Sequence, residues 1–124
     1  MATRVIFEIG SERLHAEFND SETAKEIVER LPIEIKMSRW GDEYYGSIGV
    51  TLKLSSDAKD IMEVGEIAYW PSGDALCIFF GPTPASTGSE PRAASAVNPV
   101  GRLIDSPVPL KKMGRSISVR LAKA

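Results

Sequence analysis

The sequence contains few of the residues that redox, metal or disulfide chemistry requires. It has one cysteine, Cys77, and one histidine, His15, among 124 residues. A single cysteine cannot form an internal disulfide, and no cysteine or histidine pair has the spacing of zinc ligands. We therefore expect a cytoplasmic protein with no metal site and no cofactor.

Long apolar runs and an excess of one charge are also missing. No segment approaches the roughly 20 apolar residues that span a bilayer, and the N-terminus leads directly into a strand pattern without a signal-peptide core. Fifteen basic and seventeen acidic residues give a net charge of -2, with no long run of either sign. Nucleic acids and membranes are therefore not expected as partners. A small molecule or a short peptide fits better, and the oligomeric state is left open.

The composition is that of an ordinary folded domain. The chain is 43% hydrophobic and 26% charged, which is too apolar for a disordered protein. A chain of this length buries roughly two-thirds of its unfolded surface around one core. The sequence therefore predicts a single domain over residues 1–124.

Alternation of apolar and polar residues predicts a mainly β fold. Residues 3–9 and 12–18, joined by Gly10-Ser11, have the pattern of a β-hairpin whose second strand turns His15 away from the core. Residues 75–80 are apolar on both faces, which indicates a central strand. The same reasoning predicts further strands at 33–38, 50–54, 66–70, 97–104 and 115–121.

One amphipathic helix is predicted over residues 20–31. A cluster of N-cap residues at 19–22 precedes apolar residues at helical spacing, and Pro32 ends the pattern. The apolar stripe needs a surface to cover, so we expect this helix to close the end or side of a barrel. Residues 81–96 are rich in glycine and proline, and irregular segments of that length are often functional. Residues 107–114 are expected to form a short turn or 3₁₀ segment.

Residues 65–84 carry a family resemblance. They read GEIAYWPSGDALCIFFGPTP and are similar to a run found in the cyclophilin-like family of small bacterial and archaeal proteins, except that Glu66 stands where aspartate is usual. Residues 40–43 and 94–102 match the same family. The resemblance implies a closed cyclophilin-like β-barrel with one principal α-helix and a cleft on its outer face. It does not imply the proline isomerase activity of ordinary cyclophilins.

The candidate ligand-binding residues are mainly aromatic. Because side chains alternate along a strand, Tyr69 and Trp70 point to opposite faces, as do Phe79 and Phe80, so each residue belongs either to the core or to a cleft. Glu43 is either a solvated turn carboxylate or a carboxyl group buried against rings with a raised pKa. The full set of candidates is Arg39, Trp40, Glu43, Tyr45, Tyr69, Trp70, Phe79, Phe80, Ser95 and Asn98.

The polar candidates have competing interpretations. Ser95 and Asn98 can satisfy the backbone of the long loop or can act as polar anchors for a ligand. Ser95 has no base nearby in sequence, and His15 lies on an outward strand face, so a catalytic triad is not expected. Cys77, within an apolar strand, is expected to be buried, unpaired and inert. No glycine-lysine signature of a phosphate-binding loop is present.

Three functional hypotheses follow. The first is a binding module that holds a small molecule or short peptide in an aromatic-lined cleft, with Glu43, Ser95 and Asn98 as anchors. The second is an enzyme, either a proline isomerase or a hydrolase-like subunit, because some amide-hydrolysing complexes carry cyclophilin-like domains. The third is a structural partner. The Phe-His-Arg run of ordinary cyclophilins is absent, and Arg39 is the one candidate to replace its arginine. We therefore favour the binding module and assign no catalytic residue.

Overall fold

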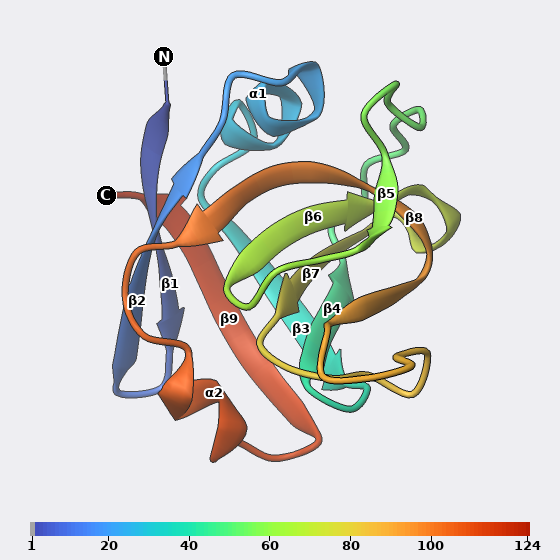
Figure 1. Cartoon of the computed structure of the whole chain (residues 1–124). Helices are drawn as coiled ribbons and strands as arrows, with labels where there is room; N and C mark the ends of the chain where they lie inside the picture. Colours follow the sequence, from blue (N-terminus) through green and yellow to red (C-terminus); the bar gives the residue numbers. More distant parts are fainter. Residues whose placement is uncertain (1) are drawn as a thin grey trace.

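The chain forms a closed antiparallel β-barrel with one principal helix, as expected from the sequence (Figure 1). The computed structural model describes residues 2–124. Its strands are β1 Thr3–Ile9, β2 Glu12–Phe18, β3 Ile33–Arg39, β4 Glu43–Ser47, β5 Lys59–Ile61, β6 Glu66–Trp70, β7 Ala75–Phe79, β8 Arg92–Leu103 and β9 Ser116–Lys123. Its helical segments are α1 Glu22–Val28, the 3₁₀ turn η1 Pro71–Gly73 and α2 Val108–Lys111.

Eight strands make the barrel, in the order β2-β1-β9-β3-β4-β7-β6-β8, and β8 closes it by pairing with β2. At the closure Ala16 pairs with Leu103 and Phe18 pairs with Gly101. Gly101 has to be glycine, because a Cβ there would lie 2.2 Å from the carbonyl oxygen of Glu17. The short β5 lies outside the barrel, against the first half of β8.

The barrel interior holds the main hydrophobic core. In the predicted hairpin β1–β2, Val5 and Phe7 point inward opposite Ala16 and Leu14 in register. His15 points outward, as expected, and its Nδ1 lies 3.0 Å from Oδ2 of Asp105. The alternation of the sequence therefore identified the inner face of this hairpin correctly.

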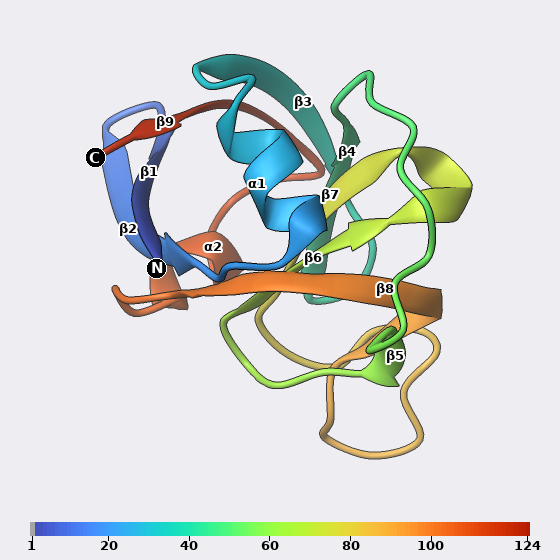
Figure 2. The ribbon, with the colours of Figure 1, turned by 90° about the horizontal axis from the view of Figure 1, so that it is seen from above.

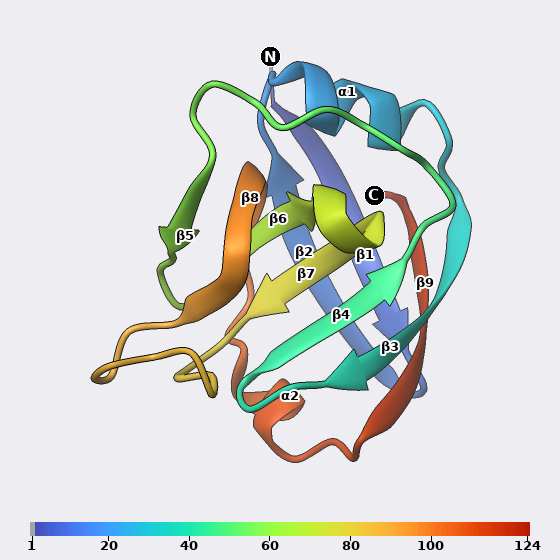
Figure 3. The same cartoon turned by 90° about the vertical axis from the view of Figure 1, so that its right-hand side faces the viewer.

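A second, smaller cluster covers the outside of β6 and β7. It consists of the buried residues Met62, Ala68, Cys77, Phe79, Ala93 and Val97, with Tyr45 and Trp70 packed against it. The first half of β8 supplies its cover, and Figure 3 shows β8 and β5 side by side there. Strand β7 is therefore buried on both faces, which confirms the predicted central strand, and Cys77 is buried and unpaired.

Helix α1 lies across one mouth of the barrel, while α2 lies at the opposite end (Figures 1 and 2). The hydroxyl of Ser21 caps α1 by accepting a hydrogen bond from the N–H of Ala24. The helix is shorter than the predicted 20–31. After Val28 the hydrogen bonds change to the i to i+3 type, since the N–H of Leu31 bonds to the Val28 carbonyl. Pro32 follows and prevents the helix from continuing. Among residues 2–124, no helix combines the length and the apolar character needed to cross a membrane.

The strand predicted at residues 50–54 does not form. This segment runs beneath α1, where side chains hold its backbone instead of a neighbouring strand. Oδ1 of Asn98 accepts the N–H of Ser55 at 2.8 Å, and Nδ2 of Asn98 donates to the carbonyl of Lys53 at 2.8 Å and to Oγ1 of Thr23 at 3.1 Å. The N–H of Leu52 bonds to the hydroxyl of Tyr69. The alternation of apolar and polar residues at 50–54 therefore predicted a strand wrongly.

Other segments also differ from the sequence prediction. Strand β8 begins at Arg92, so the irregular loop spans 81–91 and not 81–96, because the outer layer extends this strand past the barrel. The segment expected as a short turn or 3₁₀ segment at 107–114 contains the one-turn helix α2.

Two strands were not predicted. Strand β4 begins at Glu43, in a region that the sequence interpretation placed in a turn. Strand β5 has three residues, which are too few for alternation to be detected.

We predict that Asn98→Ala lowers the free energy of unfolding by about 2–4 kcal/mol, because the part-buried Ser55 N–H and Lys53 carbonyl and the buried Thr23 hydroxyl lose a common partner. Urea denaturation measures this change. Asn19→Ala is the control, since Asn19 also makes two hydrogen bonds but in an exposed position, and a loss of under about 1 kcal/mol is expected there. Equal losses in the two variants would contradict the role given to Asn98.

Candidate functional site

A cavity of about 220 Å³ lies on the outer face of the barrel. Strand β4 turns Tyr44 into the barrel core and so places Glu43 and Tyr45 on the outside. The lining residues are Trp40, Glu43, Tyr45, Trp70 and Ala94. Three aromatic side chains and one carboxyl group from separate parts of the sequence thus meet at one place.

Trp70 is held in a fixed position at this cavity. Its ring meets Tyr45 edge to face, with centroids 6.4 Å apart and planes at 84°. Its Nε1–H donates to the hydroxyl of Ser95 at 2.7 Å. A Cβ on Gly73 would lie 2.7 Å from the ring, so the η1 turn requires glycine there to let the indole pack closely. This wall is therefore formed before any ligand binds.

Glu43 is the polar group of the cavity. Glu43 is only 5% exposed, and its Oε1 has no hydrogen-bond partner. Within residues 2–124, this is the one buried side-chain nitrogen or oxygen without a partner. Burial raises the pKa of Glu43 from its ordinary value of 4.5 to about 7, and a hydrogen bond with the Cys77 thiol partly opposes that rise. Glu43 therefore lies in strand β4 as a buried carboxyl group, and is not a solvated turn residue.

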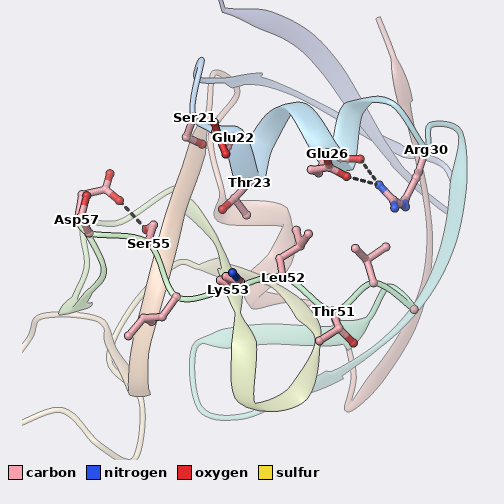
Figure 4. Close-up of a pocket in the computed structure, with 14 residues that line it drawn as sticks. Ser21, Glu22, Thr23, Glu26, Arg30, Thr51, Leu52, Lys53, Ser55 and Asp57 are labelled. Atoms are coloured by element: carbon pink, nitrogen blue, oxygen red, sulfur yellow. Dashed lines mark hydrogen bonds and ion pairs between the residues drawn. The ribbon is translucent and has the colours of Figure 1, made fainter.

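A larger groove lies between α1 and residues 49–57 (Figure 4). Its volume is about 900 Å³, and its walls are mostly polar side chains of α1 and of the irregular segment. These groups bond to one another: Nη1 of Arg30 lies 2.9 Å from Oε2 of Glu26, and the hydroxyl of Ser55 lies 2.6 Å from Oδ1 of Asp57. Thr23 accepts from Asn98. Among the described residues, the one buried side-chain nitrogen or oxygen without a partner belongs to Glu43 and not to this groove, so the outer cavity is the stronger candidate site.

The sequence named four of the five lining residues. Trp40, Glu43, Tyr45 and Trp70 converge as proposed, and Ser95 supports the cavity through its bond to Trp70. That these residues bind a ligand stays a prediction.

Four other candidates do not line this cavity. Tyr69 and Phe80 belong to the barrel interior, and Phe79 is fully buried in the outer cluster, opposite Glu43 in register. Asn98 uses its whole amide to hold the segment under α1. Asn98 therefore satisfies loop backbone, which is the structural interpretation of this residue, and does not act as an anchor at this cavity.

Arg39 is also a structural residue and does not reach the outer cavity. Its guanidinium lies over the rings of Tyr44 and Phe80, which are inside the barrel, at 5.8 and 5.1 Å from their centroids. It donates to the carbonyls of Gly41, Lys111 and Met113 and to Oδ1 of Asp42. Arg39 therefore closes the α2 end of the barrel, on the other side of the sheet from Glu43.

Two features of the site were missed from the sequence. Ala94 lines the cavity, although a small exposed residue carries no sequence signal. The contact between Glu43 and Cys77 joins strands that pair in register, and only the pairing of β4 with β7 could have revealed it. Burial, with a contribution from Glu43, raises the pKa of the Cys77 thiol well above its ordinary value, which agrees with the inert thiol predicted.

The expected absence of a catalytic triad also agrees with the geometry. His15 lies next to the residue of β2 that pairs with Leu103. Ser95 is eight residues earlier than Leu103 on β8, which corresponds to roughly 26 Å along an extended strand. The hydroxyl of Ser95 is engaged by Trp70. No histidine is therefore available to activate this serine.

Comparison with known proteins agrees with the fold and with the resemblance seen in the sequence. The model of the Cyclophilin-like family matches residues 1–122, so the chain belongs to this family. The solution structure of the hypothetical protein AF2241 from Archaeoglobus fulgidus is similar, with a TM-score of 0.83 and 36% sequence identity over 98% of this chain and 95% of that one. No match to a curated protein was found.

We predict that Glu43→Gln stabilises the protein above neutral pH. Between pH 4.5 and 7 the unfolded chain ionises at Glu43 while the folded protein keeps the proton, so the wild type loses free energy of unfolding as pH rises. The loss amounts to at most about 3 kcal/mol and is complete above pH 7. Glutamine does not titrate, so the variant should gain on the wild type across this range in urea denaturation at pH 4, 6 and 8.

Glu12→Gln provides the matched control, because it makes the same charge change at an exposed position in the β1–β2 hairpin. Its difference from the wild type should stay constant across the same pH range. A constant difference for Glu43→Gln as well would show that Glu43 titrates normally in the folded protein.

Proposed function

We propose that this protein binds a small organic ligand in the outer cavity, with Glu43 as the polar anchor. The observation that carries the proposal is the unpartnered Oε1 of Glu43, buried at a cavity with aromatic walls. A buried polar atom without a partner costs free energy, and folded proteins leave few such atoms. A ligand that bonds to Oε1 would remove that cost, which is why this group points to binding.

The size of the cavity limits the ligand. About 220 Å³ is below the range of roughly 300–1,000 Å³ typical of drug-sized ligands. A single ring, or one side chain of a short peptide, fits this space. The aromatic side chains of Trp40 and Trp70 suit a planar or compact apolar group, while Glu43 suits one polar group attached to it.

Proline isomerase activity is the second candidate, because it is known from the same fold class. Catalysis of imide rotation, with its barrier of about 18–20 kcal/mol, requires a positioned hydrogen-bond donor. Arg39 does not line this cavity, and its donors are occupied by backbone carbonyls and Asp42. The donors that the cavity offers are the Trp40 indole N–H, the Tyr45 hydroxyl and protonated Glu43. Fold analogy alone is a weak argument for activity, and we favour binding without turnover.

The two tryptophans of the chain provide a direct test of binding. Both line the cavity, so the two indole N–H signals in a ¹⁵N-correlated NMR spectrum report on it without further labelling. We predict that some single-ring fragments shift both signals in a saturable manner. Trp40→Ala should weaken that binding about ten-fold or more, while the dispersion of the other signals shows that the variant is folded.

Arg30→Ala is the control for the binding test, because Arg30 lines only the larger groove and the variant should bind the same fragments unchanged. Fragments that shift the signals of α1 and of residues 49–57, and leave both indoles unmoved, would place the site in that groove instead.

We further predict little or no turnover of a short Xaa-Pro peptide in an NMR exchange assay. Robust turnover that is lost in Glu43→Gln and kept in Glu12→Gln would favour the enzyme over the binding module. Turnover that is lost in a folded Arg39→Ala variant would instead assign the donor to Arg39.

A further inference from the structure

We propose that the ligand of the outer cavity is a small organic cation, an ammonium group carried on a compact apolar body. The inference rests on the proposed function, since it assigns a chemical class to the ligand of the same cavity. Its basis is a buried carboxyl group that faces aromatic walls and has no basic side chain beside it. The missing positive charge would come from the ligand.

Of three basic side chains on neighbouring strands, two are held by other partners. Arg39 lies on the inner side of the sheet. Arg92, two residues before Ala94 on β8, pairs with Asp60 and Glu90. Lys36 lies on the outer face of β3, where it is exposed, two residues from Ser38, the partner of Tyr45. None of these side chains is among the causes of the Glu43 pKa shift.

The aromatic walls favour the same charge. The face of an aromatic ring carries a negative potential, and the indole ring of tryptophan attracts cations most strongly. Trp40 and Trp70 both line the cavity, and Tyr45 stands edge to face with Trp70. A cation that meets the face of one of these rings gains from the ring and from Glu43 together, whereas an anion is repelled by the Glu43 carboxylate.

Hydrogen bonding narrows the class further. Oε1 of Glu43 has an unused acceptor position, and an ammonium N–H can donate to it. This gives a charge-assisted hydrogen bond to a carboxyl group that is itself buried. A quaternary ammonium has no N–H to offer, so a primary or secondary amine is the better fit.

Binding should depend on pH through Glu43. The carboxylate form binds the cation, so affinity falls as pH drops below the pKa of about 7. The titratable group in contact with Glu43 is Cys77 on β7. Burial raises the pKa of this thiol well above its ordinary value, so Cys77 stays uncharged over this range. Tyr45 of β4 also lines the cavity.

Three probes of matched shape test the inference by the two indole signals: benzylammonium chloride, benzyl alcohol and sodium benzoate. At pH 8 we expect benzylammonium to bind about ten-fold tighter than benzyl alcohol and benzoate not to bind. At pH 5.5 the affinity for benzylammonium should fall about thirty-fold, in proportion to the ionised fraction of Glu43, and that for benzyl alcohol should change little. Glu43→Gln should remove the preference for the cation, while Glu12→Gln keeps it.

Each outcome decides between the two proposals. Benzyl alcohol or benzoate binding as tightly as benzylammonium would overturn the cation inference and leave small-ligand binding intact. Failure of all three probes to shift either indole, up to their solubility limits, would overturn the inference and count against the binding function. If Glu43→Gln does not fold, the comparison of probes and pH values on the wild type still decides the matter.

Discussion

The burial of β6 and β7 on both faces is the constraint on which the barrel and its outer cavity depend. The inner faces of these strands pack into the barrel, and their outer faces carry Ala68, Cys77 and Phe79, which water would otherwise reach. Strand β8 both completes the barrel and covers the outer faces of β6 and β7. Its second half closes the barrel against β2, and its first half crosses the outer face with β5. The cavity forms at the margin of this cover, where Ala94 of β8 approaches β4.

The sequence was sufficient for the fold class and for the first hairpin, because alternation along a strand with one solvent-exposed face assigns each side chain to a face. It did not predict strand β4 of the barrel. The sequence was insufficient for strands that are buried on both faces. In β7 every residue is apolar or small and buried, so nothing local indicates whether Phe79 or Phe80 faces outward. The outer cover comes from residues more than ten positions away, and only the pairing of strands reveals it.

The sequence was also insufficient to assign the roles of the buried polar residues. Asn98 and Glu43 were both candidates for ligand anchors, and both are buried. Asn98 has partners for its whole amide, from α1 and from the segment beneath it. Glu43 has one oxygen without any. Composition and spacing do not distinguish these cases, because the difference lies in which long-range neighbours each side chain meets. A satisfied amide stabilises the fold, whereas an unsatisfied carboxyl group costs stability that a ligand could restore.

Glu43 therefore provides the most direct test of the whole account. With the glutamate side-chain carboxyl carbon labelled by ¹³C and assigned through Glu43→Gln, NMR titration of the folded protein measures its pKa. We expect the Glu43 carboxyl group to titrate with a midpoint of about pH 7, well above the ordinary value of 4.5. The reason is that this carboxyl group is buried beside aromatic side chains without a charged partner. A midpoint near 4.5 would mean that water or another side chain already satisfies Glu43, and the case for a binding site there would fail.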